Sequence, residues 1–583
     1  MSLPPLFNLF AFHSPDSELR EVVRMAVTAG GMFGEAAVLS SGWLVGRAPL
    51  PGRRLEDSEA TKRGLFFVEG GESIVGPGGC LDGEFCDALA ARSQDAPGRL
   101  AEYPGDFGFV SLAKNGATVV RSCGGSAPFH VCRGRNWSAI ATRMEFLVRF
   151  VPGRFSYDPL VNALWASGWT WFPDHRTFFR EVFSVERGGF ARLDELGIRF
   201  GAYWDPRPAR PAVFSKRAAR DRAEEFREAL IRRLERDLDD RGGNLLSLSG
   251  GVDSASLGDL AARTCGRQVS TMSVLPEDDR AYEREMSFIA PLGRRCGFRK
   301  MWEHRISQES YLESMERAPR TAFHLTHPVL CLLEEVLFEE PFKVLFGGEF
   351  ADQLCGSVTT LPDLVDDASW EDFLRNLGEP PFVPGRFAVW LKHRLRRVRG
   401  KLPSMSPLPS RLPGMFDQAI HEDLEELRHR RLREALADDR PWRHLAALSE
   451  MDGWVAMNWE AASALGVRRS FPFFNREMIE LAFRRHPAEM FGSGPKRALR
   501  EALSGRVGEI NLCREDKGGW GRYLNGMNPW SWNGGLTAGM QALLRPECGL
   551  ERPKEIDFNS VKILTRLMVF ERGVQESTNA CRL

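Results

Sequence analysis

Several features that mark secreted, membrane-bound or nucleic-acid-binding proteins are missing from this sequence of 583 residues. Its 11 cysteines form no C-x-x-C pair, and an odd number cannot all pair internally, so we expect neither a zinc site nor a disulfide framework. No run of about 18 apolar residues is present, which argues against a membrane-spanning helix. Lysine plus arginine equals aspartate plus glutamate at 78 each, so the positive charge typical of nucleic-acid-binding surfaces is absent. We therefore expect no nucleic acid and no membrane among the partners.

The remaining bulk properties describe a large globular protein. Hydrophobic residues make up 43% and charged residues 27% of the chain, whose length exceeds what one hydrophobic core usually serves. Two or more domains are therefore expected. The N-terminal stretch MSLPPLFNLFAFHSPDSELR has neither a basic start nor a long apolar core, so we expect no signal peptide. Together with the unpaired cysteines, this predicts a soluble, cytoplasmic protein.

The first part of the chain, residues 1–207, has the pattern of a β-rich domain. Short runs such as DFGFVSLA and GATVVRS flank the turn residues KNG, as in a β-hairpin. The stretch YWDPRPARPAVFSKR then carries several prolines, and we interpret it as a linker. A second domain is predicted over residues 216–583.

This second domain is predicted to begin with an amphipathic helix. Its apolar residues recur at helical spacing: Phe226, Leu230, Leu234 and Leu238. The runs NLLSLS, QVSTMSV and KVLFGGEFADQL are then predicted as a first, second and third strand, with the helical stretch AYEREMSFIAPLGRRCGF before the third. Such alternation predicts a parallel sheet with helices on both faces, whose ligands bind at the carboxyl ends of the strands. From about residue 360 onward helical patterns dominate.

Residues 245–257, LLSLSGGVDSASL, combine a strand, a glycine turn and a helix start. Gly250 and Gly251 leave the backbone bare and permit positive φ angles. We expect the hydroxyls of Ser254 and Ser256 to face outward together, beside free amides at the positive end of a helix dipole, as an anion site. No G-x-x-x-x-G-K-[ST] loop is present, and Asp253 stands where its lysine would be, which implies Mg²⁺. The alternative is a glycine turn followed by an ordinary Asp-Ser helix cap.

A second acidic motif follows an apolar strand at residues 347–357, GGEFADQLCGS. Its glycines bracket Glu349 and Asp352 at a position where a doubly wound sheet presents its ligands. A magnesium ion on a pyrophosphate needs more than one carboxylate, and Asp352 can supply the second. The alternative is a glycine-rich turn with surface acids.

These motifs resemble those of the asparagine synthetase-like amide-forming enzymes of the PP-loop ATP pyrophosphatase superfamily. The resemblance covers about residues 216–525, and the matching segments follow in the same order. The S-G-G-x-D-S motif is matched by Ser249, Gly250, Gly251, Asp253 and Ser254, and G-E-G-x-D-E-L-F-G-G is matched, with departures, by Gly348, Glu349, Asp352, Leu354 and Gly356. RRSFPFFNREMIELA resembles E-x-R-x-P-F-x-D with Asn475 in place of the acid, GSGPKRALREAL puts Lys496 at the family's catalytic lysine, and REDKGGW (514–520) resembles the R-x-K-x-G-F signal.

The resemblance implies a binding site for ATP and Mg²⁺. It assigns the nucleotide and pyrophosphate to Ser247, Leu248, Ser249, Gly250, Gly251, Asp253, Ser254, Met272, Gly348 and Lys496, and the metal to Asp253 and Asp352. Lys496 would be catalytic by stabilising negative charge, although a lysine on a helix can also simply face solvent. Glu349 would be the general base or, alternatively, a residue that orients the magnesium site.

The segment YPGDFGFVSLAKNGATVVRSCGGSAPFHV resembles the core of the glutamine amidotransferase domain of the same family. That domain normally begins with a nucleophilic cysteine, whereas position 2 here is Ser2 and the first cysteine is Cys80. Serine is a far poorer nucleophile without a dedicated base. We therefore predict a degenerate, β-rich Ntn-amidohydrolase-like sandwich without glutaminase activity (an α+β fold), followed by the α/β PP-loop domain with additional helices.

Family members without glutaminase activity include the β-lactam and carbapenam synthetases and the lasso peptide cyclases, all of which close a ring within one substrate. At the position of Glu349, the β-lactam enzymes have the tyrosine of a G-Y-x-A-D motif. This difference favours the cyclases. A lasso cyclase implies a precursor peptide as substrate, and a leader peptidase and a leader-binding (RRE) protein as partners. The alternatives are a β-lactam or carbapenam synthetase, an asparagine synthetase-like ligase, a catalytically inactive scaffold and a PP-loop ligase acting on tRNA.

Three further features are candidates for substrate contacts. The aromatic segments 163–175 and 454–466 either line a peptide cavity or fill the core. His324 and His327 either face that cavity or cap and pack locally. The basic run LKHRLRRVRGK at 391–401 is either a docking surface for an acidic partner or a solvated helix face.

Overall fold

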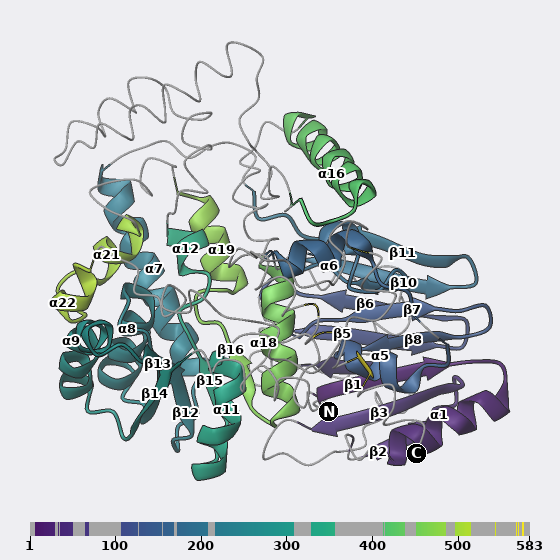
Figure 1. The fold of residues 1–583 in the computed structure, drawn as a ribbon, viewed down its shortest axis with the longest axis horizontal. Coiled ribbons are helices and arrows are strands. Elements are labelled where there is room, and N and C mark those ends of the chain that lie inside the picture. The colour runs from purple at the N-terminus through teal and green to yellow at the C-terminus, as the bar shows by residue number, and fades with distance from the viewer. Residues whose placement is uncertain are drawn as a thin grey trace, which may run out of the picture.

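The computed structural model describes the chain in parts (Figure 1). The described residues are 6–29, 33, 35–49, 65–68, 107–125, 127–153, 155–167, 169, 172–207, 216–307, 310, 328–355, 412, 414–437, 451–485, 496–514, 543, 567, 570, 574 and 575. Several sequence predictions fall outside them: Ser2, Cys80, His324, His327, Gly356, the run 391–401, residues 515–520 of the REDKGGW motif and most of the proline-rich stretch. The boundaries between residues 207 and 216 therefore remain a prediction.

The described residues of the N-terminal half form an 11-stranded sheet that divides into two leaves. One leaf contains β2 (Glu35–Val38), β3 (Trp43–Pro49), β1 (Leu6–His13), β8 (Ser138–Ala141), β7 (His130–Arg133) and β9 (Val182–Ser184). The other contains β4 (Leu65–Val68), β5 (Gly108–Ala113), β6 (Gly116–Arg121), β10 (Gly189–Asp194) and β11 (Gly197–Ala202). The leaves are joined where Leu6 pairs with Val68.

Alternating side chains along the strands build the two faces of this sandwich. In β1, Leu9 and Ala11 belong to a core shared with β5, β6 and β10 of the other leaf. Phe10 and Phe12 point the opposite way and pack against α1 (Ser17–Ala29), α5 (Met144–Phe150) and α6 (Pro159–Ala166). The predicted hairpin is confirmed, since β5 and β6 pair antiparallel around the KNG turn.

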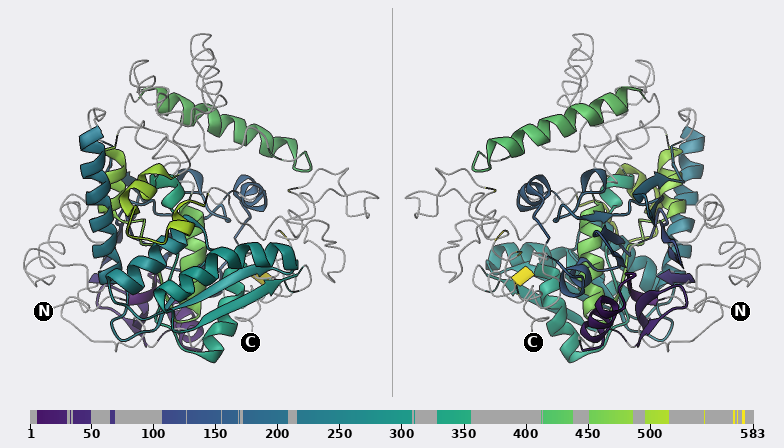
Figure 2. Two further views of the ribbon diagram at one scale, coloured as in Figure 1. Left: turned by 90° about the vertical axis from the view of Figure 1, so that its left-hand side faces the viewer. Right: turned by 90° about the vertical axis from the view of Figure 1, so that its right-hand side faces the viewer.

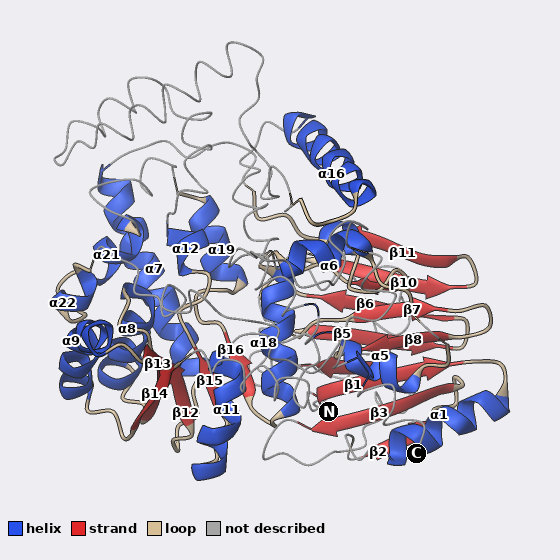
Figure 3. Ribbon diagram, in the orientation of Figure 1, coloured by secondary structure: helices blue, strands red, loops and turns tan. Residues whose placement is uncertain are grey.

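The C-terminal half contains a five-stranded, wholly parallel sheet (Figure 3). Its order is β14 (Met301–Ile306), β13 (Val269–Pro276), β12 (Asn244–Ser247), β15 (Val344–Phe346) and β16 (Arg468–Ser470). The chain moves outward from β12 to β14 and then returns to the other side of β12 with β15. The gap between β12 and β15 is therefore the topological switch point, where doubly wound sheets bind ligands.

The predicted fold class, a β-rich sandwich followed by a parallel-sheet domain, is confirmed. Two strands of the described parallel sheet were not predicted. β14 precedes the strand predicted as the third, and β16 lies in the region predicted as helical. β16 is only three residues long and rich in arginine, so its sequence carries no strand pattern. A short strand of this kind forms because β15 offers it a hydrogen-bonding edge.

Helices cover both faces of the parallel sheet. The described ones are α7 (Lys216–Asp237), α8 (Val252–Asp259) with a π-helical turn at Leu260–Thr264, α9 (Asp279–Cys296), α11 (Pro328–Glu339), α12 (Ala351–Cys355), α16 (Gln418–Ala437), α18 (Asp452–Ala464), α19 (Arg476–Phe483), α21 (Arg497–Leu503) and α22 (Glu509–Leu512). The predicted amphipathic helix is α7, and its four predicted core residues are buried. Figure 2 shows helices on both sides of the sheet, whereas α16 lies apart from it and contacts α6 (Figure 1).

Helix α18 lies between the two sheets and connects them (Figure 1). Its Glu460 contacts His130 of β7 at 2.9 Å, and both side chains are buried. Its Met457 accepts a hydrogen bond from the indole of Trp165 at 3.2 Å. The candidate cavity segments are part of this core, since Trp165, Phe172 and Trp459 are almost fully buried. The alternative interpretation, core packing, therefore holds for these three side chains.

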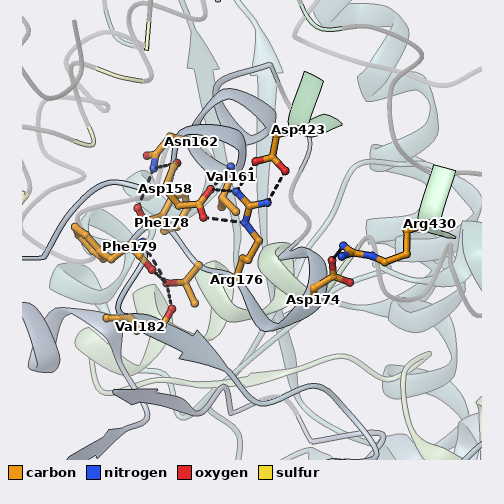
Figure 4. Close-up of polar contacts among 11 residues, drawn as sticks. Asp158, Val161, Asn162, Asp174, Arg176, Phe178, Phe179, Val182, Asp423 and Arg430 are labelled. Atoms are coloured by element: carbon orange, nitrogen blue, oxygen red, sulfur yellow. Dashed lines mark hydrogen bonds and ion pairs between the residues drawn. The ribbon is translucent and has the colours of Figure 1, made fainter. Parts of the chain in front are cut away.

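Two further contacts attach later segments of the chain to the N-terminal half. Arg176 lies between Asp158, which precedes α6, and Asp423, which lies in α16. It donates hydrogen bonds of 2.8–3.0 Å to both carboxylates (Figure 4). A cleft of about 460 Å³ lies beside this cluster. The buried ring of Phe570, near the C-terminus, packs against aromatic residues of the N-terminal half: Tyr157, Trp165, Phe178 and Phe179.

Within the described part of the chain, no helix is long and apolar enough to cross a membrane.

Candidate active site

The loop after β12 is a tight turn with a bare backbone. Gly250 has a φ of +67°, which favours glycine, and a Cβ there would lie 3.0 Å from Ile289 and 3.2 Å from Phe288. The side chain of Asn511 donates a hydrogen bond of 3.1 Å to the Gly250 carbonyl from outside the loop. Within the loop, the Ser254 hydroxyl accepts from the Ser249 amide at 3.1 Å. The turn is therefore fixed from both sides, and Gly251, at the start of α8, is only partly buried.

The two acidic motifs meet in space. A Cβ on Gly348 would lie 2.6 Å from the Cβ of Asp253 and 2.9 Å from the Ser254 amide nitrogen. No side chain fits into such a gap, so glycine at position 348 is what allows the β15 loop to pack on the start of α8. The motifs are about a hundred residues apart in the sequence and lie at the ends of neighbouring strands.

Lys496 connects the two aspartates. Its ammonium forms an ion pair with Asp253 and another, of 3.1 Å, with Asp352. Since both carboxylates contact one nitrogen, they lie close enough to share a single cation. Lys496 is 7% exposed, so the structure contradicts the surface-lysine alternative. It begins α21 with a φ of +61°, a backbone conformation uncommon for a non-glycine residue.

The charge state of Lys496 follows from these neighbours. Burial alone would lower its pKa, but the carboxylates of Asp253 and Asp352 outweigh that effect, and the pKa lies above the usual value of 10.5. The ammonium is therefore charged at neutral pH. Because the folded-state pKa is raised, its contribution to stability is present below the usual lysine pKa and is lost only as the pH rises beyond it.

Glu349 is held by Arg469 of β16. The guanidinium donates to Oε1 of Glu349, and Arg469 is 2% exposed. Burial lowers the pKa of Arg469, and the charge of Glu349 partly restores it. The other oxygen, Oε2, is buried and has no hydrogen-bond partner among the described residues. Glu349 is thus fixed through one oxygen, while its second oxygen is enclosed and accepts no hydrogen bond from the described residues.

The other predicted nucleotide contacts lie on the same edge of the sheet. Ser247 pairs with Met272 in the β12–β13 register, and the Leu248 amide donates to the Met272 carbonyl at 2.9 Å. The side chains of Leu248 and Met272 are buried, so only their backbone borders the loop.

Ser256 departs from the prediction. It is fully buried, whereas Ser254 bonds to Ser249, so the two hydroxyls do not face outward together. The reason is helical geometry: residues two apart in α8 project from different faces.

Sequence reasoning missed three residues that shape the site. Arg469 and Arg514 lie inside quoted motifs, but neither motif assigns them a partner. Arg514 contacts Glu285 of α9 at 2.9 Å and stacks over Phe288, next to the glycine turn. Asn511 carries no motif at all, and only the folded chain brings its amide to Gly250.

The described side chains fit ATP and Mg²⁺. Mg²⁺ takes oxygen ligands and is commonly bound through one or two carboxylates plus substrate phosphates. Asp253 and Asp352 offer such a pair, and no group of three or more His, Cys, Asp and Glu side chains suited to a metal occurs among the described residues. The glycine turn, the start of α8 and the Lys496 ammonium supply the donors and positive charge that phosphates need.

Comparison with known families agrees with this geometry. The family model for asparagine synthase matches residues 225–573, which is more than half of the chain. The chain belongs to the asparagine synthase family. The match covers both acidic motifs and Lys496, and it supports ATP-dependent amide formation as the general chemistry of this site.

Two solved structures are similar to parts of the chain. One is described as the allosteric regulatory enzyme of purine biosynthesis (7% identity, 52% of this chain and 90% of that chain, TM-score 0.25). The other is glutamine phosphoribosylpyrophosphate amidotransferase from B. subtilis complexed with ADP and GMP (8%, 52% and 91%, TM-score 0.26). Superpositions this loose assign neither a fold nor an activity. No curated protein matches the sequence significantly.

Proposed function

We propose that this asparagine synthase family member is an ATP-dependent peptide cyclase of the lasso type. It would activate an Asp or Glu side chain of a precursor peptide and join it to the N-terminal amine of the same peptide as a macrolactam. The observation that carries the proposal is the meeting of Asp253, Asp352 and Lys496 at the switch point, with Glu349 beside them.

The first half-reaction is adenylation. A carboxylate oxygen of the peptide attacks the α-phosphorus of ATP, and pyrophosphate leaves as the acyl-adenylate forms. Mg²⁺ held by Asp253 and Asp352 would neutralise charge on the departing pyrophosphate. Lys496, already charged, stabilises the same negative charge. The glycine turn after β12 holds the phosphates with its backbone amides.

The second half-reaction forms the amide. The peptide amine attacks the activated carbonyl, and AMP leaves through cleavage of the bond between the carbonyl carbon and the phosphate oxygen. The attacking amine must lose a proton, which the buried Oε2 of Glu349 can accept, while Arg469 keeps Oε1 in place. Glu349 instead of a tyrosine at this position supports a cyclase over a β-lactam or carbapenam synthetase.

The source of the amine follows from the first residues of the chain. With Ser2 in place of the cysteine that would release ammonia from glutamine, we expect the amine to come from the substrate itself or from another molecule. A peptide with its own N-terminal amine meets that need. The proposal includes a leader peptidase and a leader-binding (RRE) protein as partners, because the N-terminus must first be freed, and a cytoplasmic location.

The test uses the purified protein and peptides encoded by short reading frames beside its gene. We expect pyrophosphate and AMP in equal amounts, and a peptide product that has lost one water and carries no free N-terminal amine. Asp279→Asn is the matched control, because Asp279 is an exposed acid of the same domain and should leave turnover unchanged. Release of AMP with an acyclic amide product would favour the asparagine synthetase-like alternative, and no pyrophosphate with any peptide would sink the cyclase.

A further inference from the structure

A turn of the N-terminal sandwich reaches the loop that carries Glu349 and Asp352. Arg187 lies between β9 and β10, just before Gly188, which has a φ of +65°. Its guanidinium carbon is 4.0 Å from the ring centroid of Phe474 and 5.5 Å from that of Phe350. Both rings belong to the synthetase half, so this arginine crosses the boundary between the two sheets.

Phe350 occupies an unusual position in the site. It has a φ of +72°, in a region that a non-glycine residue adopts only when its surroundings enforce it. It follows Glu349 directly and precedes α12, whose second residue is Asp352. A change of backbone at Phe350 would therefore redirect the two carboxylates relative to each other.

Aromatic contacts enforce this backbone. The Phe350 ring stacks on Phe474 with centroids 4.0 Å apart and meets Phe471 edge-on at 5.7 Å. Phe350 is 2% exposed. Arg187 contacts the same pair of rings from the N-terminal side, so a cation of the other half borders the stacked rings of Phe350 and Phe474.

Arg187 is itself fixed by an ion pair. Its Nε lies 2.5 Å from a carboxylate oxygen of Asp452, at the start of α18, and Arg121 reaches the same oxygen at 3.4 Å. The terminal nitrogens of Arg187 have no hydrogen-bond acceptor among the described residues. Burial lowers its pKa to about 10, which still leaves the guanidinium charged at neutral pH. The ring faces therefore provide the main contact for its terminal nitrogens.

We propose that Arg187 is a positioning residue for amide formation: stacked on Phe474 and Phe350, it holds the loop that presents Glu349 and Asp352. The inference rests on the roles proposed above for these two acids. It gives the N-terminal sandwich a function that requires no glutamine. In this proposal the sandwich, through Arg187, holds the loop of the synthetase half that carries Glu349 and Asp352.

Three variants separate the contributions. Arg187→Met keeps much of the side-chain length and removes the charge, Arg187→Lys keeps a cation beside Asp452, and Phe474→Leu removes the ring without touching the ion pair. The matched control is Arg192→Met, because Arg192 stacks over Phe190 at 5.1 Å within its own sheet.

The first measurement is hydrogen exchange over residues 344–355 in the ligand-free protein. We expect exchange to rise by about tenfold to thirtyfold in Arg187→Met and Phe474→Leu, the range for a desolvated cation–π contact, less in Arg187→Lys, and not at all in the control. A double variant that combines Arg187→Met and Phe474→Leu should exchange no faster than the faster of the two single variants, because both substitutions remove the same contact.

The second measurement is pyrophosphate release with the linear precursor peptide that the wild type cyclises. We expect kcat to fall by a similar factor while the KM for ATP stays within about threefold, since the glycine turn is untouched. A kcat for Arg187→Lys that lies between those of Arg187→Met and the wild type supports the positioning role of Arg187.

Wild-type exchange over residues 344–355 in both Arg187→Met and Phe474→Leu would overturn the inference. Increased exchange spread evenly over both halves, with a lowered Tm, would also overturn it, since the arginine would then be only structural. The exchange measurement needs no peptide. If the wild-type protein is inactive with every peptide and the variants still show increased exchange over residues 344–355, the cyclase proposal is refuted. The positioning of the loop by Arg187 is then still supported.

Discussion

The two halves of this protein differ in where they can carry chemistry. The sandwich buries one face of each strand against its partner leaf, so its interior is apolar. The parallel sheet instead gathers the ends of β12 and β15 at one edge. The candidate site at that edge draws on two acids and a lysine from three separate segments of the chain.

The sharpest way to break this comparison is to remove one of the paired acids. Asp253→Asn or Asp352→Asn should lower pyrophosphate release by about a thousandfold or more, because the magnesium ion that would neutralise the phosphates loses one of its two carboxylate ligands. The Tm should stay close to that of the wild type, since both side chains are partly exposed. Turnover near the wild-type rate in either variant would contradict a shared metal.

Lys496→Met tests the third member of the site. The rate should fall by about a hundredfold to a thousandfold, as for other groups that stabilise developing charge. The ammonium also balances the two acids in the ligand-free protein, so its loss should strengthen binding of Mn²⁺ without nucleotide, measured by electron paramagnetic resonance. Unchanged or weaker Mn²⁺ binding would mean that the acids are not poised for one ion.

A change in the sandwich should affect stability and leave the chemistry intact. Phe570→Ala removes a fully buried ring from the aromatic group around Phe178 and should cost about 3–5 kcal/mol of the free energy of unfolding. Denaturant titration of the full chain measures it. Leu196→Ala is the control, because Leu196 is 84% exposed. Equal midpoints for the two variants would remove Phe570 from the core.

The ion-pair cluster of Arg176 should have a smaller effect. Arg176→Ala leaves Asp158, which also caps α6, without its guanidinium partner and should cost about 1–3 kcal/mol. Arg180→Ala, at an exposed arginine on the same cleft, should change the midpoint little. A larger loss with Arg180→Ala than with Arg176→Ala would show that the cluster does not hold α16.

The smallest expected effect is at Ser2. Ser2→Ala should change neither cyclisation nor stability, measured by product formation and Tm. A glutamine-dependent activity that disappears in this variant would reverse the contrast between the halves.

Sequence patterns predicted the parts of the fold that follow local rules. The helix α7, the strands β12, β13 and β15 and the β5–β6 hairpin all follow from periodicity and turn residues. The motifs located Asp253, Asp352 and Lys496, and topology explains their meeting. Periodicity could not show β16, whose pairing depends on a neighbouring strand, nor the burial of Ser256.

The cross-boundary contacts were likewise beyond sequence reasoning. The sequence SVERGGF around Arg187 contains no pattern that predicts its contact with Phe474, because that contact forms only when the two halves pack together. The same holds for Asn511 and Gly250. Long-range polar contacts of this kind have no local pattern.

The position of Phe570 has a consequence for biosynthesis. Trp165 and Phe178 are translated several hundred residues before Phe570, whose ring packs against both of them. The aromatic core of the sandwich is therefore incomplete until the segment with Phe570 has been synthesised and has folded back, so the N-terminal half cannot reach its final packing on its own.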